Sequence, residues 1–226
     1  MTGPSRWSRV DRVMLMDKHC LSEDDACFYY LQKDGLGFAE GPNKAANQTI
    51  INFKHDPHEY SRDSWPMHYK REALRMLSGA VCEFFEDRER ILGGGVTLVP
   101  VPTSKPRAAA DHDPRLDVLC EIVSKRVPFV TYVPLLDTIR DVGKVHRREA
   151  SRSVREIRSN LALDRSLIRE CSDTVALLDD VLTTGAHFSA CKGVVSEVLP
   201  GASVFGLFLA VQLRTPLRGA EDEDTF

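Results

Sequence analysis

Residues 175–188, "VALLDDVLTTGAHF", place two acidic side chains and two hydroxyl side chains directly after a run of apolar residues. Asp179 and Asp180 are adjacent, and a Thr-Thr-Gly turn at residues 183–185 follows them. Carboxylates accept hydrogen bonds from neighbouring hydroxyl groups, and a turn that opens a helix offers backbone N–H groups and a positive dipole end to phosphate. The spacing therefore predicts a sugar-phosphate site, and a ribose 5-phosphate has the matching shape.

The turn is the predicted phosphate-binding half of this site. A glycine at position 185 lets the backbone approach an anion closely, and threonine hydroxyls supply further donors. The predicted phosphate contacts are Thr183, Thr184, Gly185, Ala186 and His187. An Asp-Asp pair alone is more often an ordinary turn, and Thr-Thr-Gly alone an ordinary helix cap. The complete order of apolar strand, acids, turn and apolar helix favours the ligand site.

These side chains need a strand that ends at Asp179 and a helix that begins after the turn. Apolar runs predict further strands, and helical spacing of apolar residues predicts further helices. The expected strands are 26–32, 49–54, 96–102, 129–133, 160–163, 174–178 and 202–211, and the expected helices are 65–90, 113–126 and one after residue 187. Alternation of strand and helix indicates an α/β fold with a mainly parallel, twisted sheet flanked by helices. Ligands bind such sheets beyond the carboxyl ends of the strands.

The composition is that of an ordinary globular protein. The chain has 226 residues, of which 42% are hydrophobic and 28% charged. No apolar run is long enough for a transmembrane helix, and the first twenty residues lack the apolar segment of a signal peptide. A cytoplasmic location without membrane contact is therefore expected. The formal net charge of −3 argues against nucleic-acid binding over the whole surface, and the six cysteines form no C-x-x-C pair, so free thiols are expected.

Residues 175–187 resemble the phosphoribosyl-pyrophosphate (PRPP) signature of type I phosphoribosyltransferases. The closer similarity is to the ComF-like branch, which is named for bacterial competence for DNA uptake. Three further stretches resemble segments of that branch: "LVPVPTSKPR" (98–107), "REIRSNLAL" (155–163) and "INFKHD" (51–56). The resemblance covers roughly residues 50–212.

The resemblance implies a type I phosphoribosyltransferase fold in three parts. Residues 1–48 would form a small N-terminal hood or cap near the acceptor, residues 49–214 the core, and residues 215–226 an acidic mobile tail. The implied reaction transfers phosphoribosyl between PRPP and a nucleobase or another nitrogen nucleophile. Mg²⁺ would be the cofactor, bridging oxygens of the pyrophosphate and the sugar, and a homodimer is the implied assembly.

The resemblance also assigns roles to residues outside the turn. Asp179 and Asp180 would be the catalytic pair that holds the ribose hydroxyls. The loop after the strand at 96–102 would bind pyrophosphate through Thr103, Ser104, Lys105 and Arg107, for which a surface turn with solvated charges is the alternative. Residues 139–158 carry seven lysines or arginines against three acids. They would form a flexible loop that closes over PRPP through Lys144, His146, Arg147 and Arg148.

Two departures from the ComF-like pattern leave other functions open. The chain lacks the cysteine-rich N-terminal module that ComF-like proteins often carry, and "AAADHDPRLD" follows Arg107 where that branch usually has Arg-Gly-Phe-Asn-Gln. One alternative is a PRPP- or nucleotide-sensing regulator that binds without turnover. The other is a ComF-like accessory in DNA uptake or processing that contacts nucleic acid through the basic segment 140–158.

Overall fold

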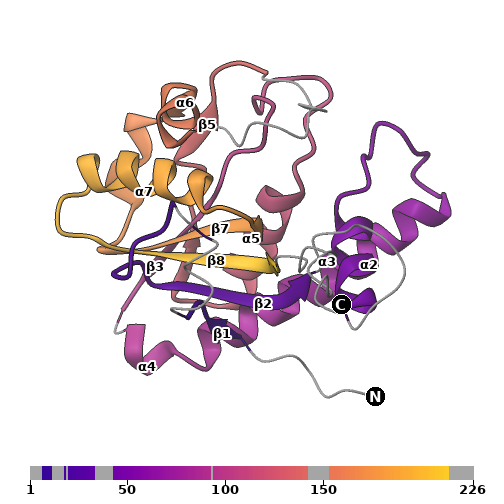
Figure 1. Cartoon of the computed structure of the whole chain (residues 1–226), viewed down its shortest axis with the longest axis horizontal. Coiled ribbons are helices and arrows are strands. Elements are labelled where there is room, and N and C mark those ends of the chain that lie inside the picture. The colour runs from indigo at the N-terminus through magenta and orange to yellow at the C-terminus, as the bar shows by residue number, and fades with distance from the viewer. Residues whose placement is uncertain are drawn as a thin grey trace, which may run out of the picture.

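A six-stranded sheet forms the centre of the protein in the computed structural model, which describes residues 7–11, 18, 20–33, 43–92, 94–141 and 153–213 (Figure 1). From edge to edge, the strands are β1 (Ser8–Arg9), β2 (Cys27–Lys33), β8 (Ser203–Gln212), β7 (Thr174–Leu182), β3 (Val96–Pro100) and β4 (Val130–Tyr132). All neighbours pair in parallel except β1 and β2. The predicted α/β class with a mainly parallel sheet is confirmed.

The two central strands carry long apolar runs because helices cover both faces of the sheet. Strands buried on both faces read as continuous apolar runs rather than as alternating patterns. In β8, the eight residues from Val204 to Val211 are all buried, and β7 buries the four residues from Val175 to Leu178. The strongest apolar runs of the sequence therefore became the two central strands.

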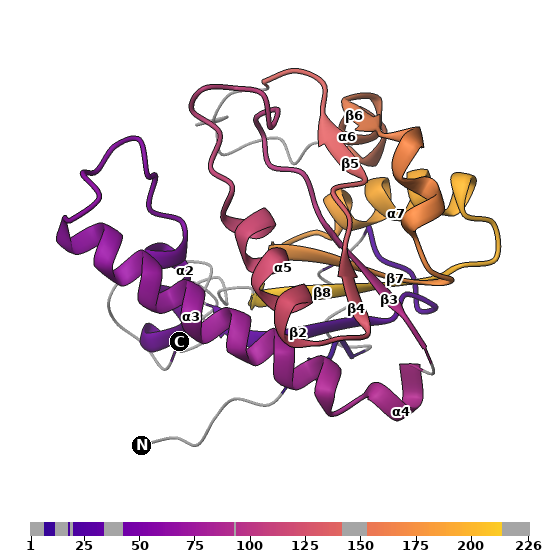
Figure 2. The ribbon, with the colours of Figure 1, turned by 180° about the vertical axis from the view of Figure 1, so that it is seen from behind.

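Two groups of helices sandwich this sheet. On one face lie α2 (Lys44–Phe53), α3 (Trp65–Glu86) and α5 (Arg115–Arg126), and on the other lie α7 (Ala186–Val198) and the shorter α6 (Val154–Ser159). Figures 1 and 2 show α3 and α7 on opposite sides of the strands. Short helices α4 (Glu89–Leu92) and η1 (Arg165–Glu170) complete the described helices. None of the described helices combines the length and the apolarity needed to cross a bilayer.

The strand expected at residues 49–54 is wrong, because these residues belong to helix α2 and its end. Asn47, Ile50 and Phe53 are the buried residues of α2, spaced by three as on one helix face. The β-branched residues of "TIIN" suggested a strand, but packing against α3 and the sheet decided the conformation. The helix expected at 65–90 is present as α3 and α4, separated by a turn at Asp87 and Arg88.

The described part of residues 1–48 contributes to the central sheet. Strand β2 lies between β1 and β8, and α2 spans the expected boundary at residue 48. Figure 1 shows α2 and the beginning of α3 projecting past the carboxyl ends of the strands. The expected acidic tail at 215–226 lies outside the described residues.

A second, two-stranded sheet lies on the α7 side of the central sheet. It pairs β5 (Leu136–Thr138) with β6 (Leu161–Leu163) in antiparallel orientation. The strand expected at 160–163 is therefore confirmed as β6. The basic segment 139–158 connects these two strands, so the small sheet fixes both ends of that segment.

Candidate functional site

The strand order reverses its direction between β3 and β7. From β3 the chain continues to β4 at one edge, whereas from β7 it continues to β8 on the opposite side. The loops that leave β3 and β7 consequently diverge and open a crevice at the carboxyl ends, where doubly wound sheets bind ligands. Val101 N donates to Leu178 O at 2.8 Å, which holds the two strand ends together beneath this crevice.

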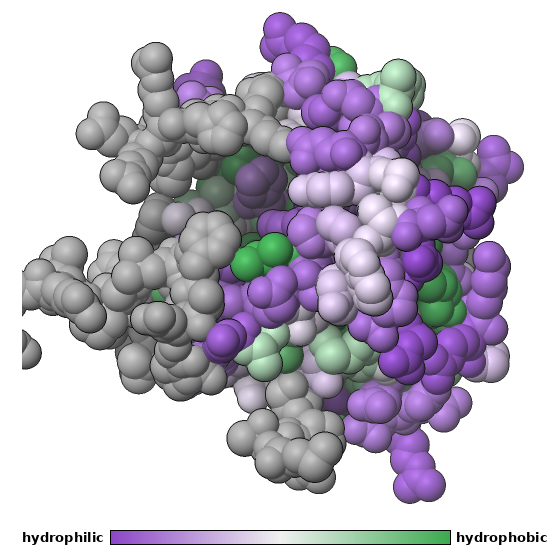
Figure 3. All heavy atoms as spheres, turned by 90° about the vertical axis from the view of Figure 1, so that its right-hand side faces the viewer, coloured by the Kyte–Doolittle hydropathy of each residue, from purple (hydrophilic) through white to green (hydrophobic). Residues whose placement is uncertain are grey.

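The crevice contains a cavity of about 560 Å³. Both strand-end loops contribute to its wall, as do the end of α2 and the beginning of α5. Its polar lining consists of Lys54, Asp56, Thr103, Ser104, Lys105, Asp111, Asp113, Arg115, Asp179, Asp180, Thr183 and His187. Figure 3 views the molecule from this end and shows a largely hydrophilic face among the coloured residues. The lining favours a polar, charged ligand over an apolar one.

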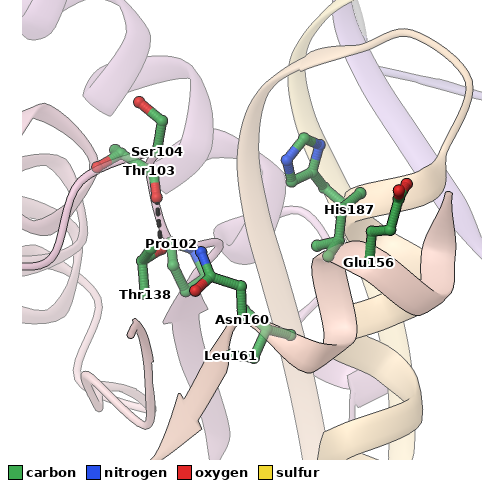
Figure 4. A pocket seen from close by; sticks show the side chains of 9 residues that line it. Pro102, Thr103, Ser104, Thr138, Glu156, Asn160, Leu161 and His187 are labelled. Atoms are coloured by element: carbon green, nitrogen blue, oxygen red, sulfur yellow. Dashed lines mark hydrogen bonds between the residues drawn. The ribbon is translucent and has the colours of Figure 1, made fainter. Parts of the chain in front are cut away.

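A smaller cavity of about 280 Å³ adjoins the first. The two share Pro102, Thr103, Ser104 and His187. In Figure 4, Thr103 and Ser104 lie on one side of the smaller cavity, and His187 and Glu156 lie on the other. Thr138 Oγ1 donates to Thr103 O at 2.6 Å, so strand β5 supports the loop that divides the two cavities.

Asp179 and Asp180 both line the larger cavity but have different surroundings. Successive side chains of a strand point to opposite faces. Asp180 is buried on the face of α2 and α5, where its two oxygens contact Lys54 Nζ at 2.9 Å and Arg115 Nη2 at 2.7 Å. Asp179 is half-buried and accepts from the backbone N–H of Asp180 at 2.7 Å.

These surroundings shift the two carboxyl pKa values in opposite directions. Burial, together with the neighbouring charge of Asp180, raises the pKa of Asp179. Burial also acts to raise the pKa of Asp180, but the charges of Lys54 and Arg115 outweigh it and hold that pKa below the ordinary value. The pair therefore combines one carboxyl group that ionises more readily than usual with one that keeps its proton to higher pH.

Asp180 belongs to a chain of charged side chains that joins four elements, here called the charge network: Lys54, Lys70, Asp113, Arg115 and Asp180. Asp180 is buried, Lys54 is partly exposed, and the other three are largely buried. Lys70 Nζ contacts Asp113 Oδ2 at 3.0 Å, and Asp113 Oδ2 contacts Arg115 Nη1 at 2.9 Å. Lys70 Nζ also donates to the carbonyls on either side of Lys54, at 3.0 and 2.8 Å. The network thus ties the end of α2, α3 and the beginning of α5 to β7.

No pattern in the sequence indicates this network. Lys54 and Arg115 lie 126 and 65 residues before Asp180 along the chain. Asp113 could be read only as the start of a helix. Charged residues at helix ends are common, and only the packing of the helices on the sheet decides which of them meet.

The Thr-Thr-Gly turn leads into α7 as expected. Gly185 has φ 85° and forms the N-cap of the helix, a conformation that favours glycine. Of the five predicted phosphate contacts, Thr183 and His187 are exposed and line the larger cavity, whereas Gly185 and Ala186 are buried. Thr184 is half-buried, and its carbonyl accepts from Cys20 N at 3.1 Å.

A segment distant in the sequence supports this turn from behind. A Cβ added to Gly185 would lie 2.6 Å from the side chain of Leu21. Ser189 Oγ in α7 donates to the carbonyl of Cys20. Residues 20 and 21 therefore fix the turn at its buried side while its exposed side lines the cavity.

Replacing this glycine is expected to damage the turn in two ways. Gly185→Ala adds left-handed backbone strain of about 1 to 2 kcal/mol and a clash with Leu21. Gly201→Ala is the matched control, because Gly201 has φ 93° and nothing within 4 Å of an added Cβ. Chemical denaturation should show a larger loss of stability for Gly185→Ala than for Gly201→Ala. Equal losses would contradict a tight contact with Leu21.

Three of the four predicted pyrophosphate contacts line the larger cavity: Thr103, Ser104 and Lys105. Lys105 also forms an ion pair with Asp111 on the cavity wall. Arg107 is not among the lining residues of either cavity. Its Nε contacts Asp117 Oδ1 at 2.9 Å, and its Nη1 donates to Leu136 O at 2.5 Å, so the side chain fastens the loop to α5 and β5.

The four predicted flexible-loop contacts, Lys144, His146, Arg147 and Arg148, lie outside the described residues. Near the preceding end of that segment, Asn160 Nδ2 donates to Arg140 O at 2.9 Å, and Arg140 N donates to Asn160 Oδ1 at 3.1 Å. Asn160 thus braces the point at which the segment leaves β5.

The donor set of the site does not fit a metal ion held by the protein alone. Within the described ranges, no group of three or more histidine, cysteine, aspartate or glutamate side chains is arranged to hold a metal. Both oxygens of Asp180 contact cations instead. Residues of the described part therefore provide no preformed magnesium cage.

No protein-family model matches this chain, and no curated protein sequence does.

Proposed function

We propose that this protein is a phosphoribosyltransferase that binds PRPP and transfers its phosphoribosyl group to or from a nitrogenous base. One observation carries the proposal: a single cavity at the reversal of the strand order is lined by the adjacent pair Asp179 and Asp180, by Thr183 of the Thr-Thr-Gly turn, and by the hydroxyls of Thr103 and Ser104. Acids and hydroxyl donors that line one cavity suit a sugar that carries phosphate groups.

In the proposed complex, Asp179 accepts hydrogen bonds from the ribose hydroxyls, and the turn at 183–187 binds the 5-phosphate. The acceptor nitrogen forms a bond to C1 of the ribose as the bond from C1 to pyrophosphate oxygen breaks. The electron pair leaves with pyrophosphate, and the acceptor nitrogen loses its proton to water. Thr103, Ser104 and Lys105 line the cavity and stabilise the negative charge of the departing pyrophosphate in the proposed complex. The crevice aligns the two reactants.

Magnesium is proposed to accompany PRPP, with oxygens of the ligand and water as its ligands. Mg²⁺ binds oxygen atoms and retains several waters in phosphate sites. The described residues offer no metal-binding cluster, so the oxygens of PRPP and water would hold the ion.

The test measures PRPP binding by calorimetry and pyrophosphate release with Mg²⁺ and a panel of nucleobases. Thr183→Val should lower PRPP affinity about tenfold, because it removes an exposed hydroxyl from the phosphate turn. Thr131→Val is the matched control, since Thr131 is exposed on edge strand β4 and should leave PRPP affinity unchanged.

The outcomes separate the candidate functions. Release of pyrophosphate with at least one base supports the transferase. Tight PRPP binding without release for any base supports a regulator that senses PRPP. Absence of PRPP binding, or equal affinity in wild type and Thr183→Val, contradicts the proposed site.

A further inference from the structure

Two cations beside Asp180 line the larger cavity together with it. Lys54 follows the last turn of α2, and its side chain is 39% exposed. Arg115 is the first residue of α5, and its side chain is 17% exposed. Each donates to a different oxygen of the same carboxylate, at 2.9 and 2.7 Å. A carboxylate held between two cations in a cavity occupies the position that a ligand anion could take.

The surrounding residues fix these cations independently of Asp180. Arg115 is held by Asp113 through Nη1 and by its place at the beginning of α5. Lys70 donates to the two carbonyls that flank Lys54, which fixes the backbone from which the Lys54 side chain extends. Arg115 Nε is buried and has no hydrogen-bond partner among the described residues. The cation pair is therefore built into the cavity wall and retains an unused donor.

The other cations expected to meet pyrophosphate are occupied elsewhere. Arg107 contacts Asp117 and Leu136 O, and it does not line the cavity. Lys105 lines the cavity but forms an ion pair with Asp111. Among the described residues that line the cavity, Lys54 and Arg115 are the two cations that share one carboxylate. That carboxylate, Asp180, also lines the cavity.

We propose that Lys54 and Arg115 form an anion subsite for a phosphate or pyrophosphate group, and that Asp180 occupies this subsite in the ligand-free protein. A ligand anion competes with the Asp180 carboxylate for the two cations and displaces it from them. Asp180 is then a positioning residue that lowers anion affinity, whereas Asp179 is the acid that contacts the sugar. The identity of the ligand in this inference rests on the proposed function, whereas the subsite itself requires only an anion.

The test uses inorganic pyrophosphate alone, without PRPP or divalent cations, and measures its affinity by calorimetry. Asp180→Asn removes the competing charge and keeps the side-chain shape, so pyrophosphate affinity should rise about tenfold. Lys54→Met removes one cation and should lower affinity about tenfold, as for loss of one charge-assisted hydrogen bond. Lys125→Met is the control, because Lys125 lies on the exposed surface of α5 with a 76% exposed side chain and should match wild type.

The two variants are expected to change pyrophosphate affinity in opposite directions, which makes the test decisive. Lower or unchanged pyrophosphate affinity in Asp180→Asn would overturn the inference, because a carboxylate that competes with the anion for Lys54 and Arg115 must raise affinity when its charge is removed. Unchanged affinity in Lys54→Met would overturn it as well, and this variant is the safer one for folding because Lys54 is partly exposed. If pyrophosphate follows the expected pattern but PRPP does not bind, only the proposed function fails. If PRPP binds and Asp180→Asn does not raise pyrophosphate affinity, only this inference fails.

Discussion

Asp113→Ala is expected to lower the free energy of unfolding by about 3 to 5 kcal/mol, as when one partner of a buried ion pair is removed. Asp113 contacts Lys70 at 3.0 Å and Arg115 at 2.9 Å, and its side chain is 11% exposed. Its removal leaves the largely buried Lys70 without an ion-pair partner and leaves Arg115 with Asp180 alone. Burial already lowers the pKa of Lys70, while Asp113 opposes that shift. The variant should therefore release a proton from Lys70 more readily as well as unfold more easily.

Urea denaturation of Asp113→Ala and wild type measures this effect. Asp111→Ala is the matched control, because Asp111 lies two residues away and pairs with Lys105, but its side chain is 57% exposed. Exposed ion pairs contribute little to stability, so this control should unfold close to wild type. Equal loss in the two variants would show that the charge network does not hold α2, α3 and α5 to β7.

Asp179→Asn is expected to stabilise the protein at neutral and alkaline pH while weakening its ligand binding. Burial and Asp180 raise the pKa of Asp179 above the ordinary 3.8, so the folded state holds this proton more tightly than the unfolded state. The stability that results is complete below pH 3.8 and is lost as pH rises through the raised pKa. Asparagine cannot ionise, so the variant avoids the cost of a buried charge at pH 8. Its free energy of unfolding at pH 8 should exceed that of wild type by on the order of 1.4 kcal/mol for each pH unit by which folding raises the pKa of Asp179.

Thermal unfolding between pH 4 and pH 8 should consequently show a flatter pH dependence for Asp179→Asn than for wild type. PRPP affinity should fall about tenfold or more, because an acceptor for the ribose hydroxyls is weakened. Asp173→Asn provides the binding control, since Asp173 is exposed just before β7 and away from the cavity lining. If Asp179→Asn were less stable than wild type at pH 8, the conclusion that burial of the ionised Asp179 carboxylate is unfavourable would be contradicted.

The sheet and the turn were predictable because their signals are local. The apolar runs of β7 and β8 mark strands buried on both faces. Gly185 marks the turn because its conformation favours glycine. Helix α2 was mistaken for a strand since its ten residues are too few for its helical spacing to outweigh the β-branched residues Thr49, Ile50 and Ile51.

The division of roles within the site could not be predicted, because it depends on contacts between distant residues. Asp179 and Asp180 look equivalent in the sequence, and only the alternation of the strand and the positions of Lys54 and Arg115 distinguish them. The same holds for Arg107, whose partners Asp117 and Leu136 lie 10 and 29 residues away. Local patterns identified the lining residues of the two strand-end loops, whereas the lining residues of α2 and α5 and the partners of each side chain were decided by packing.

The position of β2 between β1 and β8 also constrains how the protein is made. Cys27 pairs with Gly206 and Lys33 with Gln212, so this strand joins the sheet through partners nearly 180 residues later in the chain. On the ribosome, β2 cannot pair with β8 until almost all of the described chain has emerged, and its apolar edge stays available to other chains during synthesis. Contacts of such long sequence separation slow folding. Completion of the sheet, and with it the crevice, therefore belongs to the last stage of folding, after release of β8 from the exit tunnel.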